Sequence, residues 1–161
     1  MNGAPVEPRS WGGLKATGST LIEPQDWLAE RKRNHPVLAY GNGRSYGDSC
    51  LNDGGGLIAA RRLHRILAFD AGTGIITCEA GVLLDDLLKL CVPAGWFPPV
   101  TPGTSLVTIG GALANDVHGK NHHRAGTFGR HVRAFELERS DGSRLTCAPD
   151  INGELFAATI G

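Results

Sequence analysis

Most hydrophobic residues lie in short runs that are separated by glycine, proline and small polar residues. A short apolar run that is bounded by turn residues predicts a strand rather than a helix. Two pairs of runs face each other across Asp70–Gly74 and Ser140–Ser143, which predicts two hairpins. The predicted strands are Pro36–Tyr40, Leu57–Ala60, Ile66–Phe69, Ile75–Cys78, Val132–Arg139 and Arg144–Cys147.

Apolar residues at helical spacing are rarer in this chain than short apolar runs. The apolar residues from Leu83 to Cys91 recur on one helical face, and Pro93 with Gly95 ends that helix. Strands and helices do not alternate strictly, so we expect an α+β fold rather than a doubly wound sheet. An irregular lead-in is expected over 1–35 and one domain over 36–161. Further helices are expected over Asp26–Arg33, from a Thr108 cap through Leu113, and from Glu154 to Thr159.

Composition narrows the class of protein. The 161 residues suit one domain, and 41% hydrophobic with 20% charged residues is typical of a soluble globular protein. Sixteen Lys and Arg balance sixteen Asp and Glu, which removes the electrostatic reason to expect nucleic acid or an anionic membrane. The four cysteines form no C-x-x-C pair, so reduced thiols are expected. Since residues 1–13 lack the pattern of a secretory signal and no run is long enough to span a bilayer, we expect a cytoplasmic location.

The first segment that carries chemistry is Gly41–Ser49, directly after a predicted strand. Its three glycines let successive backbone amides turn towards one anion, such as a diphosphate. A tight surface turn is the other interpretation. The spacing is not that of a Rossmann fingerprint, and the Lys-Ser/Thr pair of a P-loop is missing.

Residues 43–47 (GRSYG) also match the G-x-S-x-G elbow of serine hydrolases, with Ser45 as the nucleophile. That elbow must lie between a strand and a helix. Three glycines at 54–56 follow instead, so a hydrolase is disfavoured.

The second segment is Pro99–Gly111, with a turn at 101–104 and Thr108 before Gly110 and Gly111. Two glycines in the first turn of a helix leave free amides and the positive end of the helix dipole for a phosphate or a polarised carbonyl. Close packing of the helix explains the same glycines equally well.

The third segment, Asp116–His123, contains six polar or ionisable residues. A zinc site and a solvated polar loop are the alternatives, but the zinc site lacks a completing cysteine or carboxylate pattern. We favour an active-site loop, in which Lys120 supplies a cation, His118 a proton carrier and Asn121 an amide.

Together these segments strongly resemble the FAD-linked oxidases of the vanillyl-alcohol oxidase type, with a two-part FAD-binding domain of the PCMH type. The resemblance covers nearly everything from Tyr40 onward, and HGKNHH is its most specific part. The matching runs are GRSYGD at 43–48, GGGL at 54–57, PGT at 102–104, TIGGALANDVHGKNHH at 108–123, AGTFGRHV at 125–132 and ELFAATIG at 154–161.

The resemblance implies which residues hold FAD and which act in catalysis. The catalytic pair would be Lys120 and His118. Relatives that attach FAD covalently do so through a histidine in the first glycine segment; Arg44 stands there, so a non-covalent flavin is expected. No metal is expected. The implied FAD contacts are Gly41, Asn42, Gly43, Arg44, Ser45, Tyr46, Gly47, Asp48, Ser49, Gly103, Thr108, Ile109, Gly110, Gly111, His118, Gly119, Lys120 and Asn121.

The resemblance also implies a reaction: the C2 hydroxyl of a decaprenylphosphoryl ribose-like substrate becomes a ketone. This is the first half of an epimerisation that serves arabinan synthesis in the cell wall, and an NAD(P)-dependent reductase would complete it. A lipid-linked substrate suggests a membrane-peripheral or periplasmic location. Oxidation of another sugar, polyol or aldonolactone stays open, as does a non-catalytic flavin- or nucleotide-binding module. A cap domain normally follows, so we expect a C-terminally truncated chain that is inactive alone.

Overall fold

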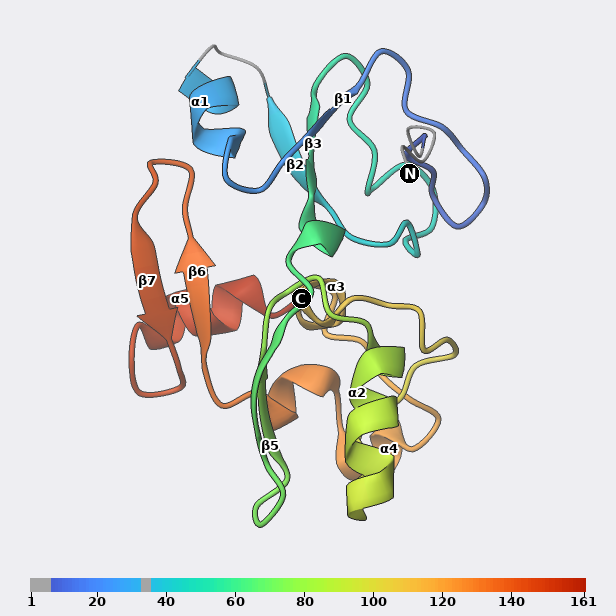
Figure 1. Cartoon of the computed structure of the whole chain (residues 1–161), viewed down its shortest axis with the longest axis vertical. Coiled ribbons are helices and arrows are strands. Elements are labelled where there is room, and N and C mark those ends of the chain that lie inside the picture. The colour runs from blue at the N-terminus through green and yellow to red at the C-terminus, as the bar shows by residue number, and fades with distance from the viewer. Residues whose placement is uncertain (1–6, 33–35) are drawn as a thin grey trace. The chain divides into compact units, whose positions relative to one another are not determined.

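A computed structural model describes residues 7–32 and 36–161 in two compact units, Met1–Leu63 and His64–Gly161. The first unit is coloured blue to green in Figure 1 and the second green to red. The strands are β1 (Thr20–Ile22), β2 (Val37–Tyr40), β3 (Gly56–Ala59), β4 (Ile66–Asp70), β5 (Ile75–Cys78), β6 (Phe135–Glu138) and β7 (Arg144–Cys147). The α-helices are α1 (Trp27–Lys32), α2 (Leu84–Cys91), α3 (Ile109–Ala114), α4 (His122–Ala125) and α5 (Gly153–Thr159).

The first unit is built on a parallel sheet in the order β1-β3-β2. Leu57 in the central strand pairs with Leu21 on one side and Leu38 on the other, and it is fully buried. Parallel strands need a crossover connection, and α1 lies in the one that joins β1 to β2 on the other side of β3. Both flanking strands therefore protect the apolar run of β3.

The prediction of an irregular lead-in was wrong for β1, because Thr20–Ile22 forms a strand that pairs with β3. Three residues are too few to show periodicity in the sequence, and the pairing partner is distant along the chain. The helix expected over Asp26–Arg33 is confirmed as α1 up to Lys32. Its expected last residue, Arg33, lies outside the residues that the structure describes, as do the rest of 33–35 and residues 1–6. The domain boundary at residue 35 stays a prediction.

Both predicted hairpins in the second unit are confirmed. In the turn between β4 and β5 the Asp70 carboxylate accepts hydrogen bonds from the Gly72 amide (2.8 Å) and the Thr73 hydroxyl (2.7 Å). These bonds favour the ionised form and hold the pKa of Asp70 below its ordinary value. Gly74 follows in the left-handed region (φ 72°), where glycine carries no steric cost.

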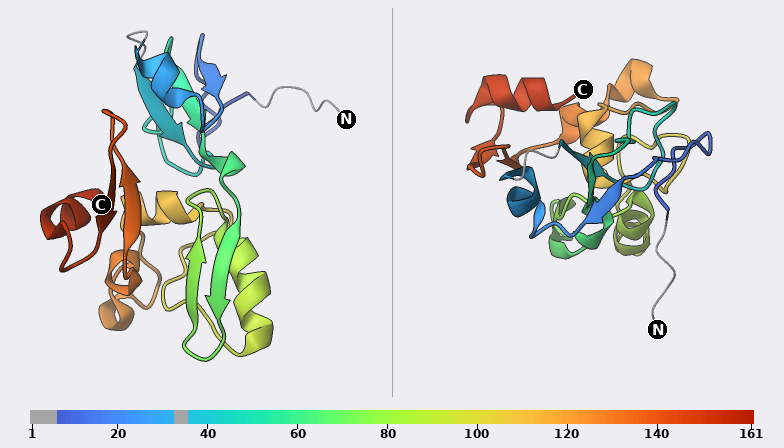
Figure 2. Two further views of the ribbon diagram at one scale, coloured as in Figure 1. Left: turned by 60° about the vertical axis from the view of Figure 1, so that its left-hand side comes forward. Right: turned by 90° about the horizontal axis from the view of Figure 1, so that it is seen from above.

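Helices cover the hairpins of this unit. In Figure 1 and in the left view of Figure 2, α2 runs alongside the β4–β5 hairpin and α5 lies against the β6–β7 hairpin. Leu84, Leu87 and Cys91 form the buried face of α2, as their spacing predicted. On α5, the Phe156 ring stacks on Phe135 of β6 with a centroid separation of 5.3 Å. The mixture of a parallel sheet, antiparallel hairpins and covering helices confirms the α+β class.

Candidate functional site

The first glycine loop, Gly41–Ser49, starts directly after β2 and leaves backbone amides unused. Gly43 and Gly47 both have φ of 60°, which reverses the direction of the backbone at two points. Among the described residues, none accepts a hydrogen bond from the amides of Gly43, Arg44, Tyr46 or Gly47. Backbone amides that have no acceptor and lie beside glycines in the left-handed region can donate hydrogen bonds to an anion.

Ser45 does not lie on a nucleophile elbow. β2 ends at Tyr40, several residues before the serine, and a turn at 47–50 follows it. No helix is found between this turn and β3 in this fully described stretch. The hydroxyl is therefore not raised above a sheet edge, and the hydrolase alternative loses its structural basis.

The start of α3 differs from the sequence-based expectation. Thr108 caps the helix, with its hydroxyl accepting from the Gly111 amide at 3.1 Å, so the predicted cap is confirmed. However, the Ile109 amide donates to the Val82 carbonyl (2.8 Å) and the Gly110 amide to the Ala80 carbonyl (2.7 Å). The expectation of free amides at this helix start was wrong, because the segment before α2 accepts them.

Close packing explains the first glycine of that pair. A Cβ at Gly110 would lie 2.9 Å from the Ala80 Cβ and 3.1 Å from the Ala80 carbonyl oxygen. Only glycine lets the two backbones approach so closely. Of the two interpretations that the sequence left open for Gly110, the structure supports packing.

Open amides lie just before α3, in the turn that contains Gly103. The amides of Gly103, Thr104 and Ser105 donate to no described residue, whereas the Ser105 carbonyl accepts from the Asp85 amide at 2.9 Å. The turn is thus fixed to the start of α2 while its donors stay available. Sequence reasoning singled out Gly103 but missed Thr104 and Ser105, although PGT marked the turn.

The third segment lies against the second. The Asn121 side-chain amide donates to the Pro99 carbonyl at 3.0 Å. Gly119 is buried, and a Cβ there would lie 2.8 Å from the Thr101 carbonyl oxygen. The structure therefore brings His118–Asn121 together with the start of Pro99–Gly111, while the first glycine loop belongs to the other unit.

His118 and Lys120 are both exposed on this segment. His118 forms a backbone bridge with Thr127, and its ring meets the His122 ring edge-on at a centroid separation of 5.4 Å. His122 begins α4, so the expected loop becomes helical at its end. No set of three His, Cys, Asp or Glu side chains within the described ranges is arranged to hold a metal ion.

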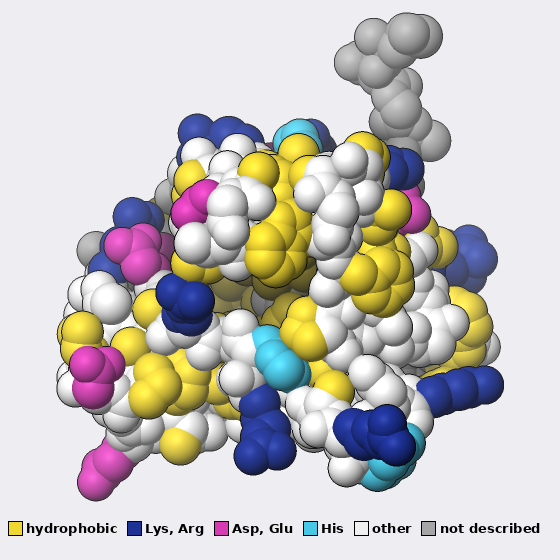
Figure 3. All heavy atoms as spheres, turned by 90° about the horizontal axis from the view of Figure 1, so that it is seen from below, with side chains coloured by type: hydrophobic (Ala, Val, Ile, Leu, Met, Phe, Trp, Pro, Cys, Tyr) yellow, Lys and Arg dark blue, Asp and Glu magenta, His cyan; other side chains and the backbone are white. Residues whose placement is uncertain are grey.

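A run without acidic residues extends from Val117 to Phe135. We call its exposed cations Lys120, Arg124, Arg130 and Arg133 the basic run. In the described part of the chain none of them pairs with a carboxylate, whereas cations elsewhere do, such as Lys89 with Asp85 at 2.7 Å. Figure 3 shows a face on which histidines lie beside Lys and Arg side chains.

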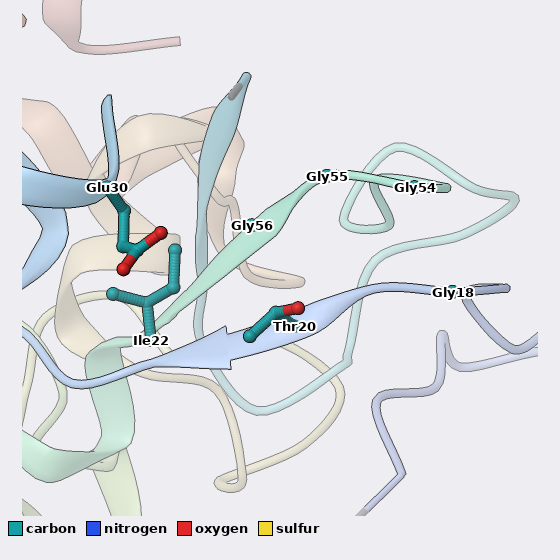
Figure 4. A pocket seen from close by; sticks show the side chains of 7 residues that line it. All are labelled: Gly18, Thr20, Ile22, Glu30, Gly54, Gly55 and Gly56. Atoms are coloured by element: carbon teal, nitrogen blue, oxygen red, sulfur yellow. The ribbon is translucent and has the colours of Figure 1, made fainter. Parts of the chain in front are cut away.

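A hollow of about 200 Å³ in the first unit holds none of the predicted site residues. Its lining comes from β1, β3, α1 and neighbouring glycines (Figure 4). The amides of Gly54, Gly55 and Gly56 already donate to the carbonyls of Thr17, Asn52 and Pro36, in that order. This hollow therefore lacks the open amides that distinguish the first glycine loop. Its lining residues are Gly18, Thr20, Ile22, Glu30, Gly54, Gly55 and Gly56.

A comparison with known protein families shows which family has these features. A family model described as an FAD binding domain matches residues 27–148. The chain belongs to this family. The model of this FAD-binding domain family spans the first glycine loop, the Gly103 turn, α3 and the basic run.

Two curated relatives are similar over most of the chain. Decaprenylphosphoryl-beta-D-ribose oxidase of Mycolicibacterium smegmatis is 43% identical over 94% of this chain and 35% of its own length. Mouse L-gulonolactone oxidase is 32% identical over 80% of this chain and 29% of its own length. The chain thus spans about a third of each relative.

A solved structure supports the fold. 6-Hydroxy-D-nicotine oxidase from Arthrobacter nicotinovorans superposes with a TM-score of 0.75 at 22% identity, over 83% of this chain and 29% of the other. The predicted fold, an FAD-binding domain of the vanillyl-alcohol oxidase (PCMH) type, is confirmed.

The residues present fit FAD. The cofactor carries a diphosphate, and the open amides of the two turns are suitable donors for phosphate oxygens or ring carbonyls. They are those of Gly43, Arg44, Tyr46, Gly47, Gly103, Thr104 and Ser105. A Cβ at Gly47 or Gly103 would meet no described atom within 4 Å, so both glycines leave space beside the backbone. The individual FAD contacts named from the sequence stay predictions, and Ile109 and Gly110 are the weakest among them because their amides are already bonded.

Proposed function

We propose that this chain is the FAD-binding part of an oxidoreductase that oxidises the C2 hydroxyl of a lipid-linked, phosphorylated ribose to a ketone. The observation that carries the proposal is 43% identity to decaprenylphosphoryl-beta-D-ribose oxidase over 94% of the chain. Membership of the FAD-binding domain family supports the cofactor.

The basic run supports a phosphorylated substrate over a neutral one. Lys120, Arg124, Arg130 and Arg133 are exposed cations without a described carboxylate partner. A phosphodiester between sugar and lipid supplies the missing negative charge. An aldonolactone, as the name of L-gulonolactone oxidase indicates for that relative, carries none, and we rank that substrate class second.

FAD when bound supplies the hydride acceptor, and the chain's own residues supply position and charge. Lys120 would hold and polarise the substrate oxygen as an ammonium donor, and His118 would order the site or carry a proton. Asn121 fixes the loop that bears both, through its bond to the Pro99 carbonyl.

We infer that the flavin is bound without a covalent link. Arg44 stands in the first glycine loop and offers no nucleophile for attachment to the flavin ring. Precipitation of the holoprotein with acid should release the yellow colour into the supernatant. A pellet that keeps the colour would contradict this inference.

Partners follow from the same proposal. An NAD(P)-dependent reductase would take over the 2-keto sugar, and contact with a membrane would come through the lipid-linked substrate. No helix among the described residues is long and apolar enough to cross a membrane. A peripheral location, cytoplasmic or periplasmic, is part of the proposal because of the lipid-linked substrate.

The test is anaerobic bleaching of the flavin absorption in the complete enzyme, with polyprenylphosphoryl ribose, an aldonolactone and a neutral polyol as separate substrates. We expect the phosphorylated sugar to reduce the flavin fastest. Lys120→Ala should slow this reduction by roughly 10²–10³-fold, as expected when a donor to the reacting oxygen is lost. Lys89→Ala, which removes an exposed cation that pairs with Asp85, is the control and should leave the rate unchanged.

If none of the substrates bleached the flavin although FAD was bound, the result would support the rival class of a non-catalytic flavin-binding module. Equal bleaching by the lactone and the phosphorylated sugar would remove the role of the basic run. An unchanged rate in Lys120→Ala would remove the role of that lysine.

A further inference from the structure

A segment before the family match packs on the first glycine loop. Arg9–Lys15 lies outside the matched residues 27–148 and closes on itself through an antiparallel bridge between Arg9 and Lys15. Within it the Ser10 amide donates to the Leu14 carbonyl at 2.9 Å, and the Gly13 amide donates back to the Ser10 carbonyl at 3.0 Å. The segment is therefore a defined turn.

Three contacts fix this turn to the loop and the strand before it. The Arg9 amide donates to the Tyr40 hydroxyl at 3.0 Å, and that hydroxyl donates to the Arg9 carbonyl at 2.7 Å. The Trp11 amide donates to the Ser45 carbonyl at 3.0 Å. These bonds determine where the loop runs, and its own amides take no part in them.

The Arg44 side chain is held where the Arg9–Lys15 turn meets the first glycine loop, a place that we call the junction. The Arg44 guanidinium lies 5.5 Å from the centroid of the Trp11 ring, within the range of a cation–π contact. Its Nη1 donates to the Asn42 carbonyl at 3.0 Å, so one edge of the guanidinium is occupied within the loop.

Two buried donors at this junction have no partner. Ser10 is 5% exposed, and its hydroxyl makes no hydrogen bond. The Arg44 Nε is likewise buried and unbonded, and these two are the buried side-chain nitrogen or oxygen atoms that lack a partner in the described part of the chain. A buried donor left unsatisfied costs about 1–3 kcal/mol, so a pair at one junction points to a ligand.

We propose that Ser10 and Arg44 form an anion subsite of the FAD site, in which the Ser10 hydroxyl and the Arg44 Nε donate to the diphosphate. Trp11 and Tyr40 are positioning residues that hold the turn on the loop. The proposal rests on the assignment of FAD as cofactor. It extends the site to a segment that precedes the matched family domain.

The test compares two serines of the same unit. Ser10→Ala removes an unpaired hydroxyl, whereas the matched control Ser19→Ala removes a hydroxyl that donates to the Asn52 carbonyl at 2.7 Å. For both variants we would measure the dissociation constants of FAD, ADP and riboflavin by fluorescence titration. The melting temperature of the ligand-free protein is the second readout.

For Ser10→Ala we expect the dissociation constants of FAD and ADP to rise about tenfold, the effect of one hydrogen bond to a charged group. Riboflavin, which lacks phosphate, should bind as it does to the wild type. The melting temperature should stay equal or rise, since no bond is lost in the ligand-free protein. Ser19→Ala should show the reverse: a lower melting temperature and unchanged affinity for FAD.

Unchanged FAD affinity in Ser10→Ala would overturn the subsite. A joint fall of affinity and melting temperature would also overturn it, because Ser10 would then be structural. If the wild type itself bound no FAD, the proposed function would fail first, and the two failures are therefore distinguishable.

Discussion

In the first glycine loop, Gly43 and Gly47 adopt φ of 60°, and the amides of Gly43, Arg44, Tyr46 and Gly47 donate to no described residue. At the start of α3, by contrast, the Ile109 and Gly110 amides donate to Val82 and Ala80, and the Gly111 amide donates to the Thr108 hydroxyl. Both segments are glycine-rich and both follow apolar residues. They differ in whether a neighbouring carbonyl or hydroxyl is within reach of their amides.

Glycine content alone therefore does not identify an anion site. A glycine can keep an amide free for a ligand, or it can remove a side chain so that another backbone approaches and takes the amide. The first glycine loop is of the former kind and Gly110 is of the latter. Variants that affect ligand binding and stability separately can test this contrast.

The largest effect is expected at Gly43. Alanine there must adopt the left-handed region and would bring its Cβ to 2.6 Å from the Tyr40 hydroxyl, against the Arg9 carbonyl. Left-handed strain and overpacking together should lower the free energy of unfolding by about 2–5 kcal/mol. Urea denaturation measures this loss, and FAD binding should be abolished.

Gly47→Ala is the matched control for Gly43→Ala. Its φ is also 60°, but a Cβ there meets no described atom within 4 Å. Only the left-handed strain of about 1–2 kcal/mol should remain. Equal losses in the two variants would show that the contact with Arg9 and Tyr40 contributes nothing.

An intermediate effect is expected at Thr108. Thr108→Ala removes the cap hydroxyl that accepts from the Gly111 amide, and should lower the free energy of unfolding by about 1 kcal/mol. The affinity for ADP should not change, because the amides at this helix start already donate to acceptors within the protein. A clear loss of ADP affinity at constant stability would move the diphosphate to α3 and reverse the comparison.

The smallest effect concerns two thiols, one in each unit. Burial raises the pKa of Cys50, which directly follows the first glycine loop, and burial with the charge of Glu79 raises the pKa of Cys78 to about 11. A raised pKa lowers the thiolate fraction, so alkylation by iodoacetamide should be slow at pH 8 and accelerate as the pH rises. For Cys78 the rate should still be increasing at pH 10.

Bound FAD should slow the alkylation of Cys50 and leave that of Cys78 unchanged. Mass spectrometry of the two cysteine peptides against time measures both rates. Protection of Cys78 instead would locate the diphosphate near the Ala80–Val82 segment, away from the first glycine loop.

Much of the fold could be predicted because its signals are local. The turns at Asp70–Gly74 and Ser140–Ser143 contain the residues that tight turns need, and both hairpins formed. The apolar face of α2 and the Thr108 cap were likewise visible within one or two helical turns. By contrast, β1 depends on pairing with β3, more than thirty residues away, which no local pattern reveals.

The residues of the candidate site likewise fall into those that the sequence indicated and those that it did not. Residue types and spacing singled out the glycine segments and the loop with His118 and Lys120, and the contact of Asn121 with Pro99 brought two of these segments together. The sequence did not indicate Ser10 or Trp11, since a serine and a tryptophan in an irregular segment carry no periodic signal. Their importance appears only where the turn meets Ser45 and Arg44.

The sequence by itself determined the α+β class, the two hairpins, the capped helix and the residue types that an FAD domain needs, because each depends on neighbours along the chain. Only the tertiary structure decided which glycine amides stay free. An amide is available to a ligand unless a carbonyl or hydroxyl lies within about 3 Å of it, and at Ile109 and Gly110 that carbonyl comes from Ala80–Val82, a segment separated from α3 by the whole of α2.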